Sequence, residues 1–265
     1  MARQPALALA RPRVAPSLKA VRRRAALVAV CGVAALGLLY LGARETPLFA
    51  LRTVEVRGAP VGVRTAVLHE LEGVHGESLV SLDGSALVRR LEALPSVEAV
   101  TYDRDFPHTL RLVVEPERPV AVVNQETGSW VVSVRGRVIS RALPDAAQAL
   151  PRIRYPYADA LVPGEFVADE ATKTILAALA QAPKRMLLPI HSGRFEAGEL
   201  TFKLSGEGGT RPLLLLGEPA DLAVKLSVAA LVLRKLSPEE RASLAYLDVS
   251  LPDRPVASDN PQVSG

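Results

Sequence analysis

The amino-acid sequence predicts an α+β protein. It has one N-terminal transmembrane helix, a small domain of order β-α-α-β-β, and a C-terminal mixed domain that is rich in strands and also contains helices. Three observations support this prediction. A charge-free apolar run follows a basic tail, strand and helix periodicities alternate over the next segment, and strand patterns bounded by glycine dominate the remainder.

Positive charge is concentrated at the N-terminus. Of the 32 lysine and arginine residues, seven lie in residues 1–24, where there is no acidic residue, and the other 25 are balanced by 28 acidic residues. The folded part is therefore not expected to bind nucleic acid. We expect residues 1–24 to form a cytoplasmic basic tail, because the cytoplasmic flanks of membrane helices carry an excess of lysine and arginine.

The apolar run covers residues 25–42 and predicts a transmembrane helix. Such a helix would be about 27 Å long, close to the hydrocarbon thickness of a bilayer. A cleaved signal peptide is the alternative, although its apolar core usually has only about 7–15 residues. We therefore expect a single-pass type II protein of the cytoplasmic (inner) membrane, with most of the chain extracytoplasmic or periplasmic. The single cysteine, Cys31, lies in the run, so the extracytoplasmic part has no disulfide.

Residues 49–117 are predicted to form the small domain. A strand that ends at a glycine is followed by two amphipathic helices, and the second helix is capped by Asp83 and stopped by Pro95. Two further strands fold about Phe106 and Pro107. A three-stranded sheet with two helices on one face is the simplest packing of these elements.

The motif Glu117-Arg118-Pro119 marks the hinge to the C-terminal domain, predicted over residues 118–257. Strand patterns separated by glycine turns alternate there with two amphipathic helices. Ser237 and Glu240 have the spacing of a capping box at the start of a third, shorter helix. Residues 258–265 have the composition of a disordered tail.

The sequence predicts no catalytic, cofactor-binding or metal-binding site. There is no nucleophile-elbow or P-loop motif, and no thiol lies outside the apolar run. The stretch GEGG lies between two strands and is typical of a hairpin turn. The histidines are scattered without paired spacing; they are His69, His75, His108 and His191. We therefore predict a protein that is not an enzyme.

Sheet edges remain as candidate interaction sites. The edge strand of an open sheet has backbone donors and acceptors that a partner strand can bind. The late strand over residues 246–250 and the segment over residues 253–257 are the candidates. The alternative is that both segments only close the C-terminal domain.

The order of elements and several local motifs resemble the bacterial cell-division family FtsQ, also called DivIB. The resemblance spans roughly residues 49–257 and is strongest over the small domain, which resembles a POTRA domain of the FtsQ type. The matching positions are Gly76, Leu79, Leu82, Leu91, Pro95, Val97, Pro107, Leu110, Glu117, Arg118 and Pro119.

The resemblance implies a non-enzymatic scaffold of the divisome at the division septum. Family members link early division proteins to septal peptidoglycan synthesis by binding FtsB (DivIC) and FtsL, and FtsW, FtsI, FtsK and FtsA are further partners to consider. The implied FtsB-binding residues are Tyr246, Asp248, Val249, Ser250, Leu251, Arg254 and Val256. Tyr246 and Asp248 match the family motif, whereas Ser250 replaces its usual arginine and Leu251 occupies a position that is often aromatic.

A POTRA-type chaperone or transport module, acting on unfolded membrane or secreted clients, is the alternative function. Such proteins usually carry a C-terminal membrane barrel, whose strands have about ten residues of alternating hydrophobicity. The sequence after residue 119 lacks that pattern, so the scaffold is the preferred interpretation.

Overall fold

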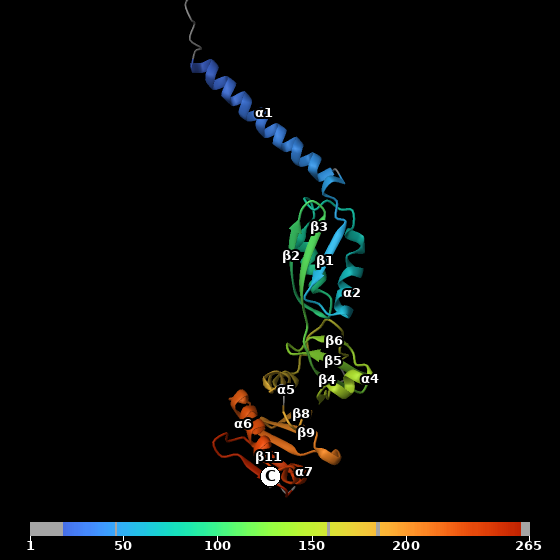
Figure 1. Cartoon of the computed structure of the whole chain (residues 1–265), viewed down its shortest axis with the longest axis vertical. Coiled ribbons are helices and arrows are strands. Elements are labelled where there is room, and N and C mark those ends of the chain that lie inside the picture. The colour runs from blue at the N-terminus through green and yellow to red at the C-terminus, as the bar shows by residue number, and fades with distance from the viewer. Residues whose placement is uncertain (1–17, 46, 158–159, 184–185, 261–265) are drawn as a thin grey trace, which may run out of the picture. The chain divides into compact units, whose positions relative to one another are not determined.

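The computed structural model describes residues 18–45, 47–157, 160–183 and 186–260 (Figure 1). The described chain divides into two compact units. One unit contains the residues up to Thr53 together with Val74–Leu82 and Arg104–Leu110, and the other contains Val54–Gly73, Asp83–Asp103 and all residues from Arg111 onward. The predicted domain boundary at residues 117–118 lies inside the second unit.

The N-terminal helix α1 spans Leu18–Glu45 and contains the predicted transmembrane run (Figure 1). Residues 1–17 of the predicted basic tail lie outside the described residues, as do the side chains at positions 18–25, 39, 43–45 and 47. Within the part of the chain that the structure describes, no helix is both long enough and apolar enough to cross a membrane.

Contacts between residues that come after α1 in the chain hold the first unit together. The 3-10 helix η1 (Pro47–Phe49) leads to Leu51, whose N–H donates to Glu77 O at 2.8 Å. The ring of Phe49 packs edge-on against Phe106, with centroids 5.7 Å apart. Pro107 follows Phe106 through a cis peptide bond in the turn between β2 and β3, which confirms the predicted turn.

The predicted order β-α-α-β-β is present. These elements are β1 (Thr53–Arg57), α2 (Val61–Glu70), η2 (Glu72–Val74), α3 (Gly84–Glu92), β2 (Val97–Asp105) and β3 (Thr109–Pro116). The three strands form a sheet in the order β1-β3-β2. Asp83 caps α3 as predicted, because its carboxylate accepts hydrogen bonds from the N–H groups of Ser85 and Ala86.

A nine-stranded sheet, in the order β12-β11-β10-β9-β8-β7-β4-β5-β6, lies in the second unit. Its strands are β4 (Pro119–Gln125), β5 (Gly128–Ser133), β6 (Val138–Arg141), β7 (Arg152–Arg154), β8 (Ile190–Glu196), β9 (Glu199–Leu204), β10 (Leu213–Gly217), β11 (Tyr246–Asp248) and β12 (Val256–Ser258). Most neighbours are antiparallel, whereas the β4–β7, β7–β8 and β10–β11 pairs are parallel.

Helices α5 and α6 pack against this sheet, α5 on β4 and β8 and α6 on β10, and they contact each other. The connecting helices are α4 (Pro144–Ala149), α5 (Glu170–Gln181), η3 (Glu207–Gly209), α6 (Leu222–Lys235) and α7 (Pro238–Ser243). The core between sheet and helices is built from aliphatic side chains with Phe202 fully buried among them. The predicted capping box is present at α7, since Ser237 and Glu240 each bind the other's backbone N–H.

Two local features differ from the expectation. Ser258, the first residue of the segment predicted to be disordered, is the last residue of β12 and pairs with Tyr246. Residues 261–265 of that segment lie outside the described residues. The short strand β7 has no sequence signal of its own, because three residues are too few for a periodicity.

Candidate partner-binding surface

The two ends of the nine-stranded sheet differ in whether their outer edge is covered. Beyond β6, the segment from Gly164 to Val167 returns along the strand: Val138 N–H donates to Glu165 O at 2.9 Å, and Gly164 N–H donates to Val138 O at 2.8 Å. At the opposite end, no segment of the described chain pairs with the outer side of β12. Of the two end strands of this sheet, β6 is therefore covered at Val138, and β12 is the one that no described segment covers.

The last strand pair carries most of the residues predicted to bind a partner. Strand β11 pairs with β10 in parallel and with β12 antiparallel, in the register Tyr246 with Ser258 and Asp248 with Val256. The connection between β11 and β12 begins with a tight turn, in which Asp248 Oδ1 accepts hydrogen bonds from Ser250 N at 2.8 Å and Ser250 Oγ at 2.6 Å. Strand β11 is thus an inner strand, and β12 is the edge.

The residues predicted to bind a partner differ in how exposed their side chains are. Leu251 and Val256 are 62% and 51% exposed, and Arg254 is also exposed, so these side chains are accessible. Tyr246, Asp248 and Ser250 are half-buried, and the Asp248 carboxylate is used to hold the turn. Val249 is fully buried in the core, and its N–H donates to Leu215 O at 2.9 Å. Its side chain therefore supports the fold and is not accessible to a partner.

The predicted hinge forms a buried joint. Glu117 is 6% exposed, and its carboxylate pairs with Arg135 and lies 3.8 Å from Arg137 Nη1. Its N–H donates to Ser96 O at 3.0 Å, which ties the connection between β3 and β4 to the segment before β2. Arg118 and Pro119 are exposed, as is Pro107, whereas Leu110 is fully buried in β3.

Arg137 was not identified from the sequence, yet it makes most of the contacts at this joint. Its guanidinium donates to Val97 O at 2.8 Å, Glu92 O at 2.9 Å, Ala93 O at 3.2 Å and Gly164 O at 3.1 Å. These carbonyls come from the α3–β2 connection and from the segment beside β6. A lone arginine in a strand-turn-strand stretch has no sequence signal for such a role, because its partners lie about 27 to 45 positions away.

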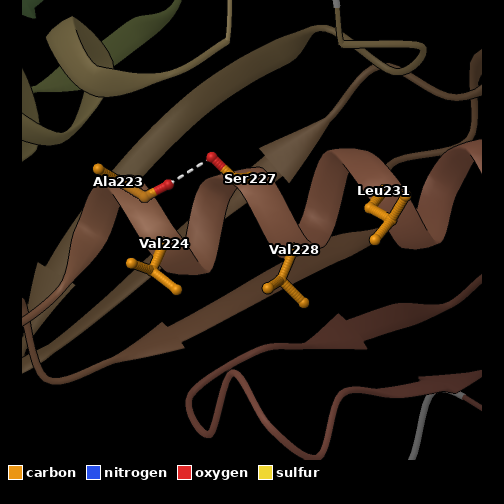
Figure 2. Close-up of a pocket in the computed structure, with 5 residues that line it drawn as sticks. All are labelled: Ala223, Val224, Ser227, Val228 and Leu231. Atoms are coloured by element: carbon orange, nitrogen blue, oxygen red, sulfur yellow. Dashed lines mark hydrogen bonds between the residues drawn. The ribbon is translucent and has the colours of Figure 1, made fainter.

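Helix α6 exposes an apolar strip next to the sheet. Figure 2 shows Val224, Val228 and Leu231 projecting from one side of the helix, with Ser227 Oγ bonded to Ala223 O. Val224 and Leu231 are 52% and 49% exposed. The strip is lined by Ala223, Val224, Ser227, Val228 and Leu231.

Within the described residues, no three or more histidine, cysteine, aspartate or glutamate side chains come together as a group that could hold a metal ion. The predicted hairpin turn GEGG is the 3-10 helix η3 between the antiparallel strands β9 and β10. The surface at β12 offers hydrogen bonding along a strand edge and contact with the exposed side chains beside it.

Comparisons with known proteins find similarity to bacterial cell-division proteins. A family model described as "POTRA domain, FtsQ-type" matches residues 49–116. The chain is 30% identical over 159 residues to the cell division protein FtsQ of Mycolicibacterium smegmatis. The aligned region covers 60% of this chain and 44% of that protein. It is 29% identical over 118 residues to FtsQ of Corynebacterium glutamicum, and this aligned region covers 44% of the chain and 50% of the relative. A Geobacter FtsQ is 27% identical over 252 residues, with 90% of this chain and 87% of the relative covered. The matches thus span about half the length of the first two relatives and most of the third.

Proposed function

We propose that this chain is a bacterial cell-division protein of the FtsQ type and acts as a non-enzymatic scaffold of the divisome. It would bind an FtsB/DivIC-like protein by strand addition to β12. The uncovered outer edge of β12 is the observation that carries this proposal. Backbone pairing at an edge supplies affinity without requiring particular side chains. The absence of the usual arginine at position 250 is therefore compatible with binding.

An FtsL-like protein joins through the same complex, and FtsW, FtsI, FtsK and FtsA remain proposed partners.

The side chains around the edge would add specificity. Val256 is exposed on β12, and Leu251 and Arg254 are exposed on the connection that precedes it. An apolar side chain of the partner would pack on Val256 and Leu251, and a carboxylate would pair with Arg254. Tyr246 and Asp248 position these groups from the neighbouring strand, and Val249 holds that strand in the core.

We also propose that α1 anchors the protein in the cytoplasmic membrane, with the N-terminus in the cytoplasm. The helix has 28 residues and carries a series of large apolar side chains that are more than half exposed, which favours burial in lipid. Carbonate extraction of membranes from cells that express the full chain tests the anchor, and protease protection tests the orientation. Recovery in the soluble fraction would contradict the anchor.

Proline substitutions at β12 test the proposed strand addition. Successive N–H groups of a strand point to opposite sides, so one of Val256 and Ala257 donates toward β11 and the other points outward. Proline at the outward position removes only a donor that a partner strand would use, whereas proline at the other breaks the pairing with β11.

We expect one of Val256→Pro and Ala257→Pro to keep the thermal stability of the wild type and to lose pull-down of the co-expressed FtsB/DivIC-like protein. Val256→Ala serves as the matched control, because it keeps the backbone N–H. Retained binding by both proline variants would exclude this edge as the docking site.

Localisation tests the wider assignment. A fluorescent fusion of the full chain is expected to concentrate at the division site of dividing cells and to co-purify with the FtsB/DivIC-like and FtsL-like proteins. A fusion that stays uniformly distributed around the membrane during division would contradict the proposed scaffold function.

A further inference from the structure

Besides α1, the first unit contains three segments that are bound to one another and are here called the tip: residues 47–53, 74–82 and 104–110. Leu79 N–H donates to Phe49 O at 2.8 Å, and Leu51 N–H donates to Glu77 O at 2.8 Å. These two hydrogen bonds tie the middle segment of the tip to the segment that directly follows α1.

The turn at Phe106 is tied to the same segment. Arg52 N–H donates to His108 O at 2.9 Å, and His108 Nδ1 donates to Ala50 O at 3.0 Å. The ring of Phe49 packs edge-on against that of Phe106, with centroids 5.7 Å apart. The turn therefore stays beside the residues that follow α1, although it comes about sixty positions later in the sequence.

Two large apolar side chains of the tip are open to solvent. Leu48 is 66% exposed and Phe106 is 51% exposed. Phe166, in the second unit, is also exposed, but two arginine guanidiniums lie 5.9 Å and 6.0 Å from its ring centroid. The described neighbour of the Phe106 ring is instead another apolar ring, that of Phe49. The exposed surface of the tip at these positions is therefore apolar.

Chain length keeps this surface close to the end of α1. The helix ends at Glu45, three residues after the apolar run, which adds about 4.5 Å. Leu48 follows three residues later, a span of at most about 10 Å even in an extended chain. When α1 spans a bilayer, Leu48 thus lies within reach of the headgroup layer, which is about 5–8 Å thick on each side. Phe106 stays close to it because it is held against Phe49.

The tip carries no net charge when its histidines are neutral. Its charged residues are two arginines and two carboxylates: Arg52, Arg104, Glu77 and Asp105. Attraction to anionic headgroups, which polybasic membrane-binding segments use, is therefore not expected. Apolar side chains at this depth bind a bilayer by burying their area at the boundary between headgroups and acyl chains.

We propose that Leu48, Phe106 and the exposed Pro107, here called the tip patch, insert into this boundary in the leaflet at the C-terminal end of α1. The inference rests on the proposed membrane anchor and goes beyond it, because it gives the tip a lipid contact of its own. An anchor alone restrains only the start of the first unit. A second lipid contact also restrains how that unit is oriented on the bilayer.

Quenching by brominated lipids tests the tip patch. Phe106→Trp in a Trp130→Phe background leaves one tryptophan in the full chain, which is reconstituted in vesicles of zwitterionic phosphatidylcholine. Interfacial groups lie about 5–10 Å deep, so we expect acyl chains brominated near the headgroup to reduce the emission about twofold or more. Chains brominated near their ends should quench less. Added salt should not change the result, because the tip has no net charge.

Two matched controls accompany this measurement. Phe166→Trp in the same background places the reporter at an exposed aromatic position outside the tip and is expected to be quenched far less. Leu48→Ser should lower the quenching at position 106 about twofold, because it removes apolar area from the tip patch. Leu143→Ser, at another exposed leucine, should leave it unchanged. Thermal unfolding of every variant verifies that the fold is kept.

The outcomes separate this inference from the proposed anchor. If the chain resists carbonate extraction but bromination does not affect emission at position 106, the tip patch is wrong and the anchor stands. If the chain is extracted, the anchor fails and the inference fails with it. Equal quenching at positions 106 and 166 would also overturn the inference. So would a shift of the position 106 emission to shorter wavelength that requires a co-reconstituted FtsL-like protein, because the patch would then belong to a protein contact.

Discussion

At the scale of single residues, Arg137 and Glu117 explain why the connection between the two sheets is a joint with defined contacts. Four carbonyl groups accept hydrogen bonds from the Arg137 guanidinium, and the buried Glu117 carboxylate lies beside it. Arginine suits this position because its planar group has five donors in a fixed geometry. The opposite charges of the Arg137 guanidinium and the Glu117 carboxylate reduce the free-energy cost of burying each group.

Arg137→Met is predicted to lower the free energy of unfolding by about 3 kcal/mol, because it leaves several buried carbonyls without a donor and removes one of the two cations beside the buried Glu117 carboxylate. Urea-induced unfolding followed by the fluorescence of the single tryptophan, Trp130, measures the loss. Arg154→Met, at an exposed position on β7, is the control and is expected to cost less than about 0.5 kcal/mol. Similar stability of the two variants would contradict this role for Arg137.

Asp169 is predicted to make stability depend on pH in the acid range. Burial alone would raise the pKa of Asp169, but hydrogen bonds from the Thr172 side chain and N–H, from Ala171 N–H and from Tyr157 hold this pKa below its ordinary value. The carboxylate form is therefore favoured by folding. Its contribution is complete above the ordinary pKa of about 3.9 and is lost as the pH falls through the lowered value.

Asp169→Asn keeps an acceptor at the N-cap of α5 but does not titrate. Melting temperatures measured from about pH 6 down to about pH 3 should therefore fall less steeply below pH 4 in this variant than in wild type. Asp145→Asn, on α4, is the comparison. Parallel pH profiles for wild type and Asp169→Asn would show that Asp169 does not contribute to the acid dependence.

At the scale of elements, β11 and β12 have different roles although they are close in sequence. Strand β11 lies between β10 and β12, and Val249 directly after it is buried and bonded to Leu215. Strand β12 has one neighbour and exposed side chains at Val256 and Ala257. A family motif that covers the last strand pair therefore combines residues that hold the sheet with residues that are accessible to a partner.

Val249→Pro is accordingly expected to damage the fold as well as binding. It removes the hydrogen bond to Leu215 and changes a fully buried side chain, so we expect a loss on the order of 3 kcal/mol in the free energy of unfolding. Leu251→Ser, at an exposed position, should leave stability within about 0.5 kcal/mol while weakening partner binding. Circular dichroism melts and pull-downs on the same preparations distinguish the two effects. Wild-type stability of Val249→Pro would contradict the inner-strand role.

At the scale of the whole molecule, the proposed scaffold needs α1 for location and the nine-stranded sheet for binding. If α1 acts only as an anchor, replacing residues 25–42 with an unrelated transmembrane helix of similar length should preserve division-site localisation and viability. Cell length and complementation of a depletion strain measure this outcome. Filamentous cells with a correctly inserted replacement would mean that α1 makes specific contacts within the membrane.

The order of elements was predictable because it depends on local patterns. Asp83, Pro95 and the capping box of Ser237 and Glu240 act within a few residues of the helix ends that they define. The turn at Phe106 and Pro107 is likewise a short-range feature. Strand β7 and the extension of β12 to Ser258 were not predictable, because such short strands are stabilised by neighbours that lie far away in the sequence.

The sequence by itself determined the α+β class and the β-α-α-β-β order, and it indicated the FtsQ resemblance and the region proposed to contain the docking strand. Tertiary structure alone decided which strand of the last pair is the edge, which of the predicted residues are accessible, and that Arg137 joins the α3–β2 connection to the segment beside β6. The physical reason is the same in each case. Edge position, burial and cross-sheet register depend on which distant segments pack together, whereas helix caps, turns and periodicity depend on residues that are adjacent along the chain.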